Sequence, residues 1–182
     1  MEVRQAAVAD LEGIIALQQQ CYVGNLNSDE KQEGFLNTVL DEQLIARAIE
    51  QESAVFVAVE EGVVIGLAVC ASWQYWSFSP SLTELASRLS EVEYDGMVFN
   101  RNNSYFWGPV CVSKGHRGKG VFEQLFLSSK AVLSKNYPLV YSYVHCDNLR
   151  SFAAHTVKVG FRYTKDFNLS GQCYKGIVYK TT

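Results

Sequence analysis

The sequence predicts a mixed α/β domain in which helices and strands are interleaved around one sheet. Segments whose apolar residues recur with a helical period alternate along the chain with short β-branched runs. The central β-branched runs are apolar without interruption, which is typical of strands buried on both faces. With 182 residues, 48% of them hydrophobic and 19% charged, the chain is long enough for one core. We therefore expect residues 1–182 to form a single domain.

The first part of the chain predicts a strand, two helices and a hairpin. Residues 2–7 favour a strand, and Asp10 is placed to cap the helix that follows. The segment 22–37, rich in Gly, Asn, Ser and Asp, predicts a loop with a short helix, and Asp41 is placed to cap a second helix. Two β-branched runs joined by a tight Glu-Glu-Gly turn predict a hairpin over 54–72.

The remainder of the chain begins with an aromatic segment at 73–103 that also holds a helical pattern. The elements expected after it are a strand at 104–113, a helix at 119–134, a strand at 139–146, a helix at about 149–158, and strands at 161–168 and 172–180. Pro109 removes a ladder donor from the first of these strands, so a bulge at Gly108-Pro109 or an ordinary edge-strand proline is expected there.

Composition excludes several classes of function. The net charge of -3 and the scattered Lys and Arg leave no basic footprint for nucleic acid, and no apolar run reaches the roughly 18 residues of a membrane span. Three histidines and dispersed cysteines have no metal-ligand spacing, so no metal is expected. The odd number of cysteines, without a Cys-x-x-Cys pair or a signal pattern, predicts reduced thiols and a cytoplasmic protein without disulfides. These cysteines are Cys21, Cys70, Cys111, Cys146 and Cys173.

The segment 110–122 carries the strongest functional signal. A β-run ends, a glycine-rich turn follows, and an amphipathic helix begins. The first turn of a helix has free backbone N–H groups and the positive end of the dipole, and glycines let a ligand approach the backbone closely. Such a turn is suited to a phosphate or pyrophosphate, and Arg117 adds a positive charge beside it.

Other interpretations of this turn fit less well or bind nothing. A Walker A loop needs Ser or Thr after the lysine, whereas Lys119 is followed by Gly120. Gly115, Gly118 and Gly120 give Gly-x-x-Gly-x-Gly, which is not the dinucleotide-binding order. A glycine-rich connection without a ligand stays open from the turn alone.

Two motifs resemble the GCN5-related N-acetyltransferase (GNAT) superfamily. The hexapeptide at 117–122, Arg-Gly-Lys-Gly-Val-Phe, is similar to the family signature Gln/Arg-x-x-Gly-x-Gly/Ala, with Phe122 where Gly or Ala is usual. The segment 148–161 is similar to the family's Asn-x-x-Ala/Ser…Tyr/His…Gly-Phe pattern, with one extra residue before Gly160. The order of elements agrees as well, so the resemblance spans roughly residues 2–180.

The resemblance implies a GNAT-like acyl-CoA N-acyltransferase fold of about six to seven strands, with helices on both faces of the sheet and splayed central strands. It implies acetyl-CoA, or another acyl-CoA, as cosubstrate, with the pantetheine arm in the gap between the strands and no metal. The cofactor-binding residues that it implies are Val110, Val112, Arg117, Gly118, Lys119, Gly120, Val121, Phe122, Asn148 and Ser151. Backbone groups near Val110 and Val112 would pair with the pantetheine amides, and Asn148 would orient the cofactor or a neighbouring loop, or only cap the helix.

The implied reaction is direct attack of an amine on the thioester, which needs a base for the amine and an acid for the leaving thiolate. His155 stands near the family's usual tyrosine and is the candidate acid, unless it is a helix-face histidine without a catalytic task. His145 is a second candidate catalytic residue. Tyr143, Glu93 and Asp95 are further candidates for the base, none of them distinguished by the sequence.

We therefore expect an N-acetyltransferase that acts on an amine of a small molecule or a protein. A non-catalytic acyl-CoA-binding or regulatory module on the same fold is the alternative, because no base is evident and the spacing at 155–160 is altered. The expected partners are acyl-CoA and an amine acceptor, without nucleic acid or membrane, and a homodimer stays open. The aromatic residues at 73–78 and 105–107 either line an acceptor pocket or pack in the core.

Overall fold

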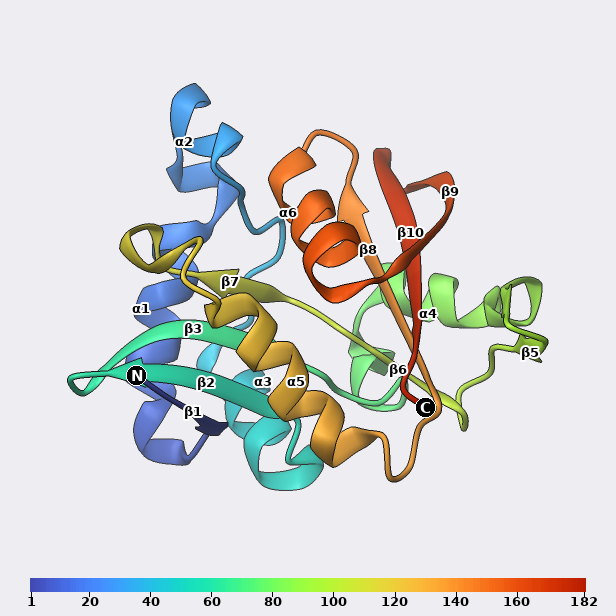
Figure 1. Cartoon of the computed structure of the whole chain (residues 1–182), viewed down its shortest axis with the longest axis horizontal. Coiled ribbons are helices and arrows are strands. Elements are labelled where there is room, and N and C mark those ends of the chain that lie inside the picture. The colour runs from blue at the N-terminus through green and yellow to red at the C-terminus, as the bar shows by residue number, and fades with distance from the viewer.

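Two four-stranded sheets that diverge at the centre of the molecule form the framework of the chain (Figure 1). The computed structural model describes residues 1–182. The first sheet is antiparallel, in the order β1 (Glu2–Gln5), β2 (Val55–Glu60), β3 (Val63–Val69) and β7 (Val110–Val112). The second has the order β6 (Ser104–Phe106), β8 (Leu139–His145), β10 (Gln172–Lys180) and β9 (Arg162–Leu169), with β6 parallel to β8. A small hairpin joins β4 (Glu93–Tyr94) to β5 (Met97–Val98).

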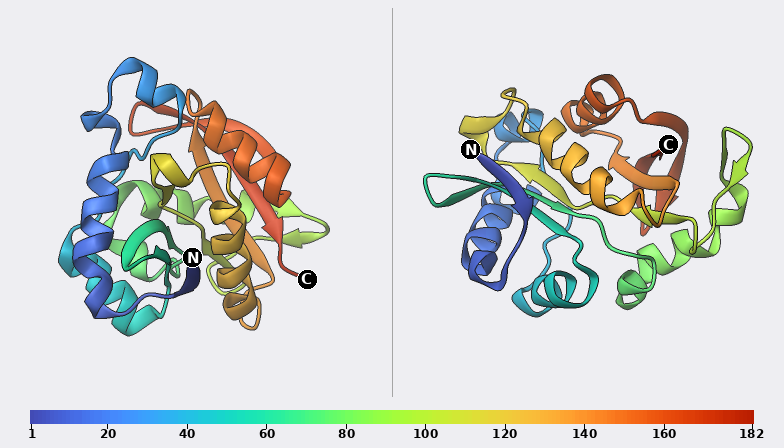
Figure 2. Two further views of the ribbon diagram at one scale, coloured as in Figure 1. Left: turned by 60° about the vertical axis from the view of Figure 1, so that its left-hand side comes forward. Right: turned by 60° about the horizontal axis from the view of Figure 1, so that its bottom comes forward.

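Helices cover both faces of these sheets, as the two views of Figure 2 agree. The helix α5 (Val121–Leu133) packs on one face of the first sheet, and α1 (Leu11–Cys21) and α3 (Glu42–Arg47) pack on the other. The remaining helices are α2 (Ser28–Gln32), α4 (Pro80–Ser87) and α6 (Leu149–Ala153), the last continued by a π-helical turn at Ala154–Val159. None of the helices is both long and apolar enough to cross a lipid bilayer. The mixed α/β class predicted from the sequence is confirmed.

Local signals place several of these elements as predicted. The Asp41 carboxylate accepts from the Leu44 N–H (2.9 Å) and caps α3. The turn of the β2–β3 hairpin has positive φ at Glu61 (50°) and Gly62 (79°), as a type I′ turn requires. Asp10 differs, because its side chain makes no hydrogen bond to α1. It pairs instead with the Arg4 guanidinium (2.7 Å), which holds the pKa of Asp10 below its usual value.

The expected strand at 104–113 is not one strand, and this prediction is wrong. It divides into β6, which pairs with β8 in the second sheet, and β7, which pairs with β3 in the first. Gly108 has φ 136°, which favours glycine, and Pro109 has no N–H to continue a ladder. The chain therefore changes sheet at Gly108-Pro109, and this division together with the β4–β5 hairpin raises the expected six to seven strands to ten.

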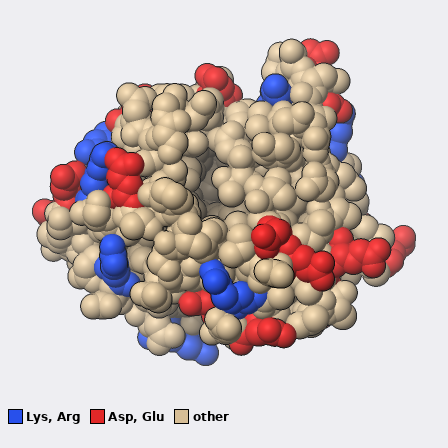
Figure 3. All heavy atoms as spheres, turned by 180° about the vertical axis from the view of Figure 1, so that it is seen from behind, with Lys and Arg blue, Asp and Glu red and all other residues tan.

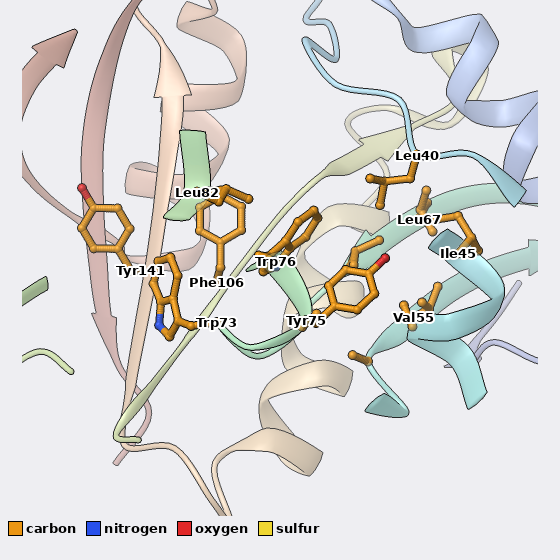
Figure 4. Packing of buried hydrophobic residues seen from close by; sticks show 14 of the residues in the cluster. Leu40, Ile45, Val55, Leu67, Trp73, Tyr75, Trp76, Leu82, Phe106 and Tyr141 are labelled. Atoms are coloured by element: carbon orange, nitrogen blue, oxygen red, sulfur yellow. The ribbon is translucent and has the colours of Figure 1, made fainter. Parts of the chain in front are cut away.

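The aromatic segment after β3 is part of the core. Figure 4 shows the rings of Trp73, Trp76 and Phe106 close together; ring centroids lie 5.7 Å apart for Trp73–Phe106 and 5.8 Å for Trp76–Phe106. They belong to one cluster with residues of α1, α3 and α4, whereas a second cluster lies under α5. The predicted helical pattern after the aromatic residues is confirmed as α4.

The expectation of five reduced cysteines is wrong. Cys146, directly after β8, and Cys173, near the start of β10, form a disulfide, and the Cys146 N–H donates to the Cys173 carbonyl (3.0 Å). The two residues are 27 apart in sequence but lie opposite each other on neighbouring antiparallel strands, with 5.5 Å between their Cα atoms. Cys21, Cys70 and Cys111 are free and buried.

Replacing Cys146 and Cys173 together by Ser should lower the free energy of unfolding. The disulfide closes a 27-residue separation, and losing that constraint on the unfolded chain costs about 3 kcal/mol. Urea unfolding followed by circular dichroism measures the change. Wild-type protein in reductant should lose a similar amount, and the double variant should be insensitive to reductant. Equal stability of wild-type protein with and without reductant would contradict the prediction.

Candidate functional site

The two sheets diverge between β7 and β8 and leave an open cleft of about 320 Å³, which we name the main cleft. It is lined by residues of α1, the loop after α2, β7, the turn before α5, and the first turns of α5 and α6. A smaller hollow of about 90 Å³, which we name the side pocket, adjoins it. Phe35, Val110 and Ser151 line both spaces, so the two meet at these residues.

The strand β7 presents an unpaired main-chain edge to the main cleft. On its other edge, the Val69 N–H donates to the Pro109 carbonyl (3.0 Å) and the Ser113 N–H donates to the Ile65 carbonyl (2.8 Å). Because alternate residues of an antiparallel strand bond to the same neighbour, the backbone groups of Val110 and Val112 point away from β3. No strand pairs with β7 on that side, so the backbone groups of Val110 and the N–H of Val112 are open to a ligand, whereas the Val112 carbonyl accepts from Arg117 Nε.

The glycine-rich turn brings the start of α5 to the same cleft. Gly118 (φ 76°) and Gly120 (φ 81°) both have the left-handed conformation that favours glycine, and Gly120 is the N-cap of α5. The first hydrogen bond of the helix runs from the Gln124 N–H to the Gly120 carbonyl (3.1 Å), so the N–H groups of residues 121–123 precede the helical ladder. Of the turn residues, Arg117, Gly118, Val121 and Phe122 line the main cleft, whereas Lys119 and Gly120 do not.

Arg117 fixes the turn instead of being free beside it. Its Nε donates to the Val112 carbonyl (2.9 Å) and its Nη1 donates to the Glu33 carbonyl (2.6 Å). The guanidinium therefore joins the end of β7 to the loop after α2. A hydrogen bond from the Cys111 thiol and the charge of Arg117 together lower the pKa of Cys21, which also lines the cleft, to about 7.

Asn148 both caps α6 and holds a loop. Its Oδ1 accepts from the Ser151 N–H (3.2 Å), and its Nδ2 donates to the Phe35 carbonyl (2.8 Å). The side chain is buried, with 5% exposure. Of the alternatives for this residue, the helix cap and the contact with a neighbouring loop are therefore both present.

Charged residues to which the motifs assign no role stand along the main cleft. Arg150 pairs with the Glu33 carboxylate (2.7 Å), and Lys158 pairs with Glu123 (3.3 Å). His116 joins the turn to the hairpin, since its Nε2 lies 2.9 Å from a Glu60 carboxylate oxygen. The sequence did not identify these residues, because their partners are distant in the chain.

The surroundings of His155 do not favour the role of proton donor. Its Nε2 accepts from the Trp107 indole N–H (3.0 Å), and its Nδ1 lies 2.7 Å from the Ser151 carbonyl, to which it can only donate. Phe122 packs against the ring, with 4.8 Å between the ring centroids. Burial to 2% exposure lowers the pKa of His155 to about 4, so the imidazole is neutral at pH 7. His155 is placed to position Trp107 beside Gly108.

Of the other candidates for proton transfer, two line the side pocket and two lie away from both spaces. His145 lines the side pocket; its Nδ1 accepts from the Asp147 N–H (3.1 Å) and its Nε2 lies 2.9 Å from Gln172 Oε1. Tyr143 also lines the side pocket, and burial raises the pKa of its phenol. The phenol therefore stays protonated at neutral pH and in that form cannot act as the general base. Glu93 and Asp95 line neither space, and Asp95 pairs with Lys180 (2.6 Å).

One cluster has residue types that can hold a metal. Cys146, Asp166 and Cys173 lie close together, but the two cysteines are bonded to each other and so offer no thiolate.

Replacing His155 by Gln should flatten the acid side of the stability curve. The folded state keeps His155 neutral down to about pH 4, whereas the unfolded state takes up a proton below about pH 6.5, so stability is lost as the pH falls between these values. At pH 5 this group alone costs about 2 kcal/mol relative to pH 7. Urea unfolding of both proteins at pH 7 and pH 5 measures it. Between pH 7 and pH 5 the wild type should lose more free energy of unfolding than the variant. Equal losses would show that His155 is not held neutral by burial.

Comparison with solved structures identifies the fold. The yncA protein of Salmonella typhimurium, solved with acetyl-CoA, is 16% identical with a TM-score of 0.67 over 100% of this chain and 94% of its own. Ribosomal-protein-alanine N-acetyltransferase of Brucella melitensis is 18% identical with a TM-score of 0.65, covering 99% of both chains. PaiA N-acetyltransferase of Thermoplasma acidophilum, solved with coenzyme A, is 15% identical with a TM-score of 0.65, covering 98% of both.

No curated protein matches the sequence. The family model of the acetyltransferase (GNAT) family matches residues 11–161, which include β7, the glycine-rich turn and α6. This match covers most of the chain and agrees with the fold. The chain belongs to the GNAT acetyltransferase family.

Proposed function

We propose that residues 1–182 act as a single acyl-CoA-dependent N-acyltransferase domain, with acetyl-CoA as the cosubstrate. The observation that carries the proposal is the unpaired edge of β7, which runs from the start of α5 to the side pocket. The pyrophosphate binds at residues 117–122, where N–H groups precede the helical ladder. The pantetheine amides pair with the backbone groups of Val110 and with the N–H of Val112, because the Val112 carbonyl already accepts from Arg117. The same fold in yncA with acetyl-CoA and in PaiA with coenzyme A supports this arrangement.

In this arrangement the thioester lies where the main cleft and the side pocket meet. A neutral amine in the side pocket attacks the thioester carbonyl, a C–N bond forms, and the C–S bond then breaks. The nitrogen loses a proton, and the leaving thiolate gains one. The proposed donor is the Tyr143 phenol, because it lines the side pocket; it gives its proton to the thiolate sulfur and takes up the proton that the nitrogen loses, so that it ends protonated as it began. His155 acts as a positioning residue, through Trp107.

One observation favours a non-catalytic acyl-CoA-binding module as the second candidate. Both ring nitrogens of His145 and of His155 are engaged, and no carboxylate lines the side pocket. A binder of this kind would retain the main cleft and its affinity for coenzyme A, but would not release free thiol.

Replacing Gly120 by Glu should weaken the binding of coenzyme A. The substitution places a carboxylate and a strained backbone (φ 81°) at the N-cap that receives the pyrophosphate. Isothermal titration should show at least about a tenfold loss of affinity, because a lost charge-assisted contact costs more than 1.4 kcal/mol. Gly62→Glu is the matched control, since Gly62 has nearly the same φ (79°) in a distant turn. Unchanged affinity in Gly120→Glu, with the fold retained, would refute the pyrophosphate site.

Replacing Tyr143 by Phe should slow turnover without weakening coenzyme A binding. Loss of a general acid lowers kcat by about a hundredfold or more, whereas the ring packing is conserved. Free thiol released from acetyl-CoA in the presence of a panel of amines measures the rate. Tyr163→Phe, at a half-exposed tyrosine outside both spaces, is the control. Equal kcat in Tyr143→Phe and wild type would exclude Tyr143 as donor, and tight coenzyme A binding without turnover of any amine favours the binder.

A further inference from the structure

The side pocket has no acidic residue, lysine or arginine in its lining, and its two histidines are His145 and the neutral His155. Its walls come from the loop after α2, from the 3₁₀ turn and helix that follow β3, from the crossing at residues 106–110, and from β8 and β10. Figure 3 shows the molecule hollowed between its two halves on the face opposite to that of Figure 1, with uncharged atoms around the hollow. A second positive charge on an acceptor would therefore be desolvated in the pocket without a partner, which is costly.

Aromatic rings form a continuous wall of the side pocket. Ring centroids lie 5.8 Å apart for Trp76–Phe106, 5.3 Å for Phe106–Tyr143 and 4.6 Å for Tyr143–Tyr174. All four residues line the pocket. Such a wall favours a flat ring, which stacks or meets the rings edge-on, over a flexible aliphatic chain.

One wall residue carries a hydrogen-bond donor without an acceptor. Trp76 is 2% exposed, and its indole Nε1 has no partner in the protein. A buried donor left unpaired destabilises the protein, and a ligand oxygen that reaches it restores the missing hydrogen bond. Trp76 thus brings an unpaired donor to the wall of the side pocket, where no Asp, Glu, Lys or Arg side chain is present to pair with an ion.

The lack of acidic and basic side chains other than histidine in the side pocket also suits the protonation state that acyl transfer requires of the amine. The attacking amine must be neutral, and a pocket without carboxylates lowers the pKa of an amine buried in it, because burial penalises the ammonium form. An acceptor with a single amino group gains from this effect. A polyamine would lose, since its remaining ammonium groups stay charged.

We propose that the side pocket binds a small primary amine that carries one aromatic ring and an oxygen acceptor such as a hydroxyl, and no second positive charge. The inference rests on the proposed acyl transfer and names its acceptor class. The volume of about 90 Å³ admits a ring at most, with the amine at the junction that Val110 and Ser151 form with the main cleft.

The test compares four amines with acetyl-CoA: tyramine, phenethylamine, spermidine and a lysine-containing peptide. For wild-type protein, kcat/KM for tyramine should exceed that for spermidine and the peptide by at least about tenfold, the discrimination that an apolar pocket achieves. Tyramine should also exceed phenethylamine, and Trp76→Phe should narrow that ratio because it removes the indole N–H and keeps a ring.

Because Trp76 is buried and its variant can lose stability, a surface variant gives an independent test. Thr38→Glu adds a carboxylate at an exposed lining residue and should shift the tyramine-to-spermidine ratio towards spermidine by at least about threefold, as expected for a charge pair near the surface. Gln51→Glu, an exposed residue outside both spaces, is the matched control and should leave the ratio unchanged.

The outcomes separate this inference from the proposed function. Faster acetylation of spermidine or the peptide than of tyramine overturns the acceptor class and leaves the acyltransferase intact. Coenzyme A binding without turnover of any of the four amines also overturns it. Failure to bind coenzyme A overturns the proposed function itself.

Discussion

The crossing of the chain between its two sheets is the constraint on which the rest of the structure depends. The segment 104–112 is too short for a single strand that pairs with both sheets. Its first half, β6, therefore pairs with β8, and its second half, β7, pairs with β3. The sheets must then separate along β7, and the separation leaves one edge of that strand without a partner. The main cleft is therefore a consequence of how the strands pair: it lies where β7 has no neighbouring strand in the second sheet.

Polar side chains keep this opening from collapsing. Arg117 lines the main cleft and Asn148 lines the side pocket, and each donates a hydrogen bond to a backbone carbonyl of the same loop, at Glu33 and Phe35 respectively. The loop is thereby held from both sheets. The Trp107–His155 hydrogen bond ties the crossing segment to the turn after α6 in a similar way. Residues of the two family motifs thus fix the loop and the crossing segment around the site as well as lining it.

Much of the fold could be predicted from the sequence, since the order of elements, the Asp41 cap and the hairpin follow from local periodicity and turn chemistry. The turn before α5 was located for the same reason. The environment of His155 could not be predicted, because it depends on Trp107, which lies 48 residues earlier, and on Phe122. The disulfide was missed because the register of β8 and β10 brings Cys146 and Cys173 together, and spacing alone does not reveal a register.

The bond between Cys146 and Cys173 has a topological consequence. It converts the intervening stretch, which contains Asn148, all of α6, His155 and β9, into a covalent ring of main chain. The tight turn at Ser170-Gly171 lies within this ring. A protease that cuts the turn would therefore release no fragment: the two new ends stay joined through sulfur, and the pieces separate only when reductant is added.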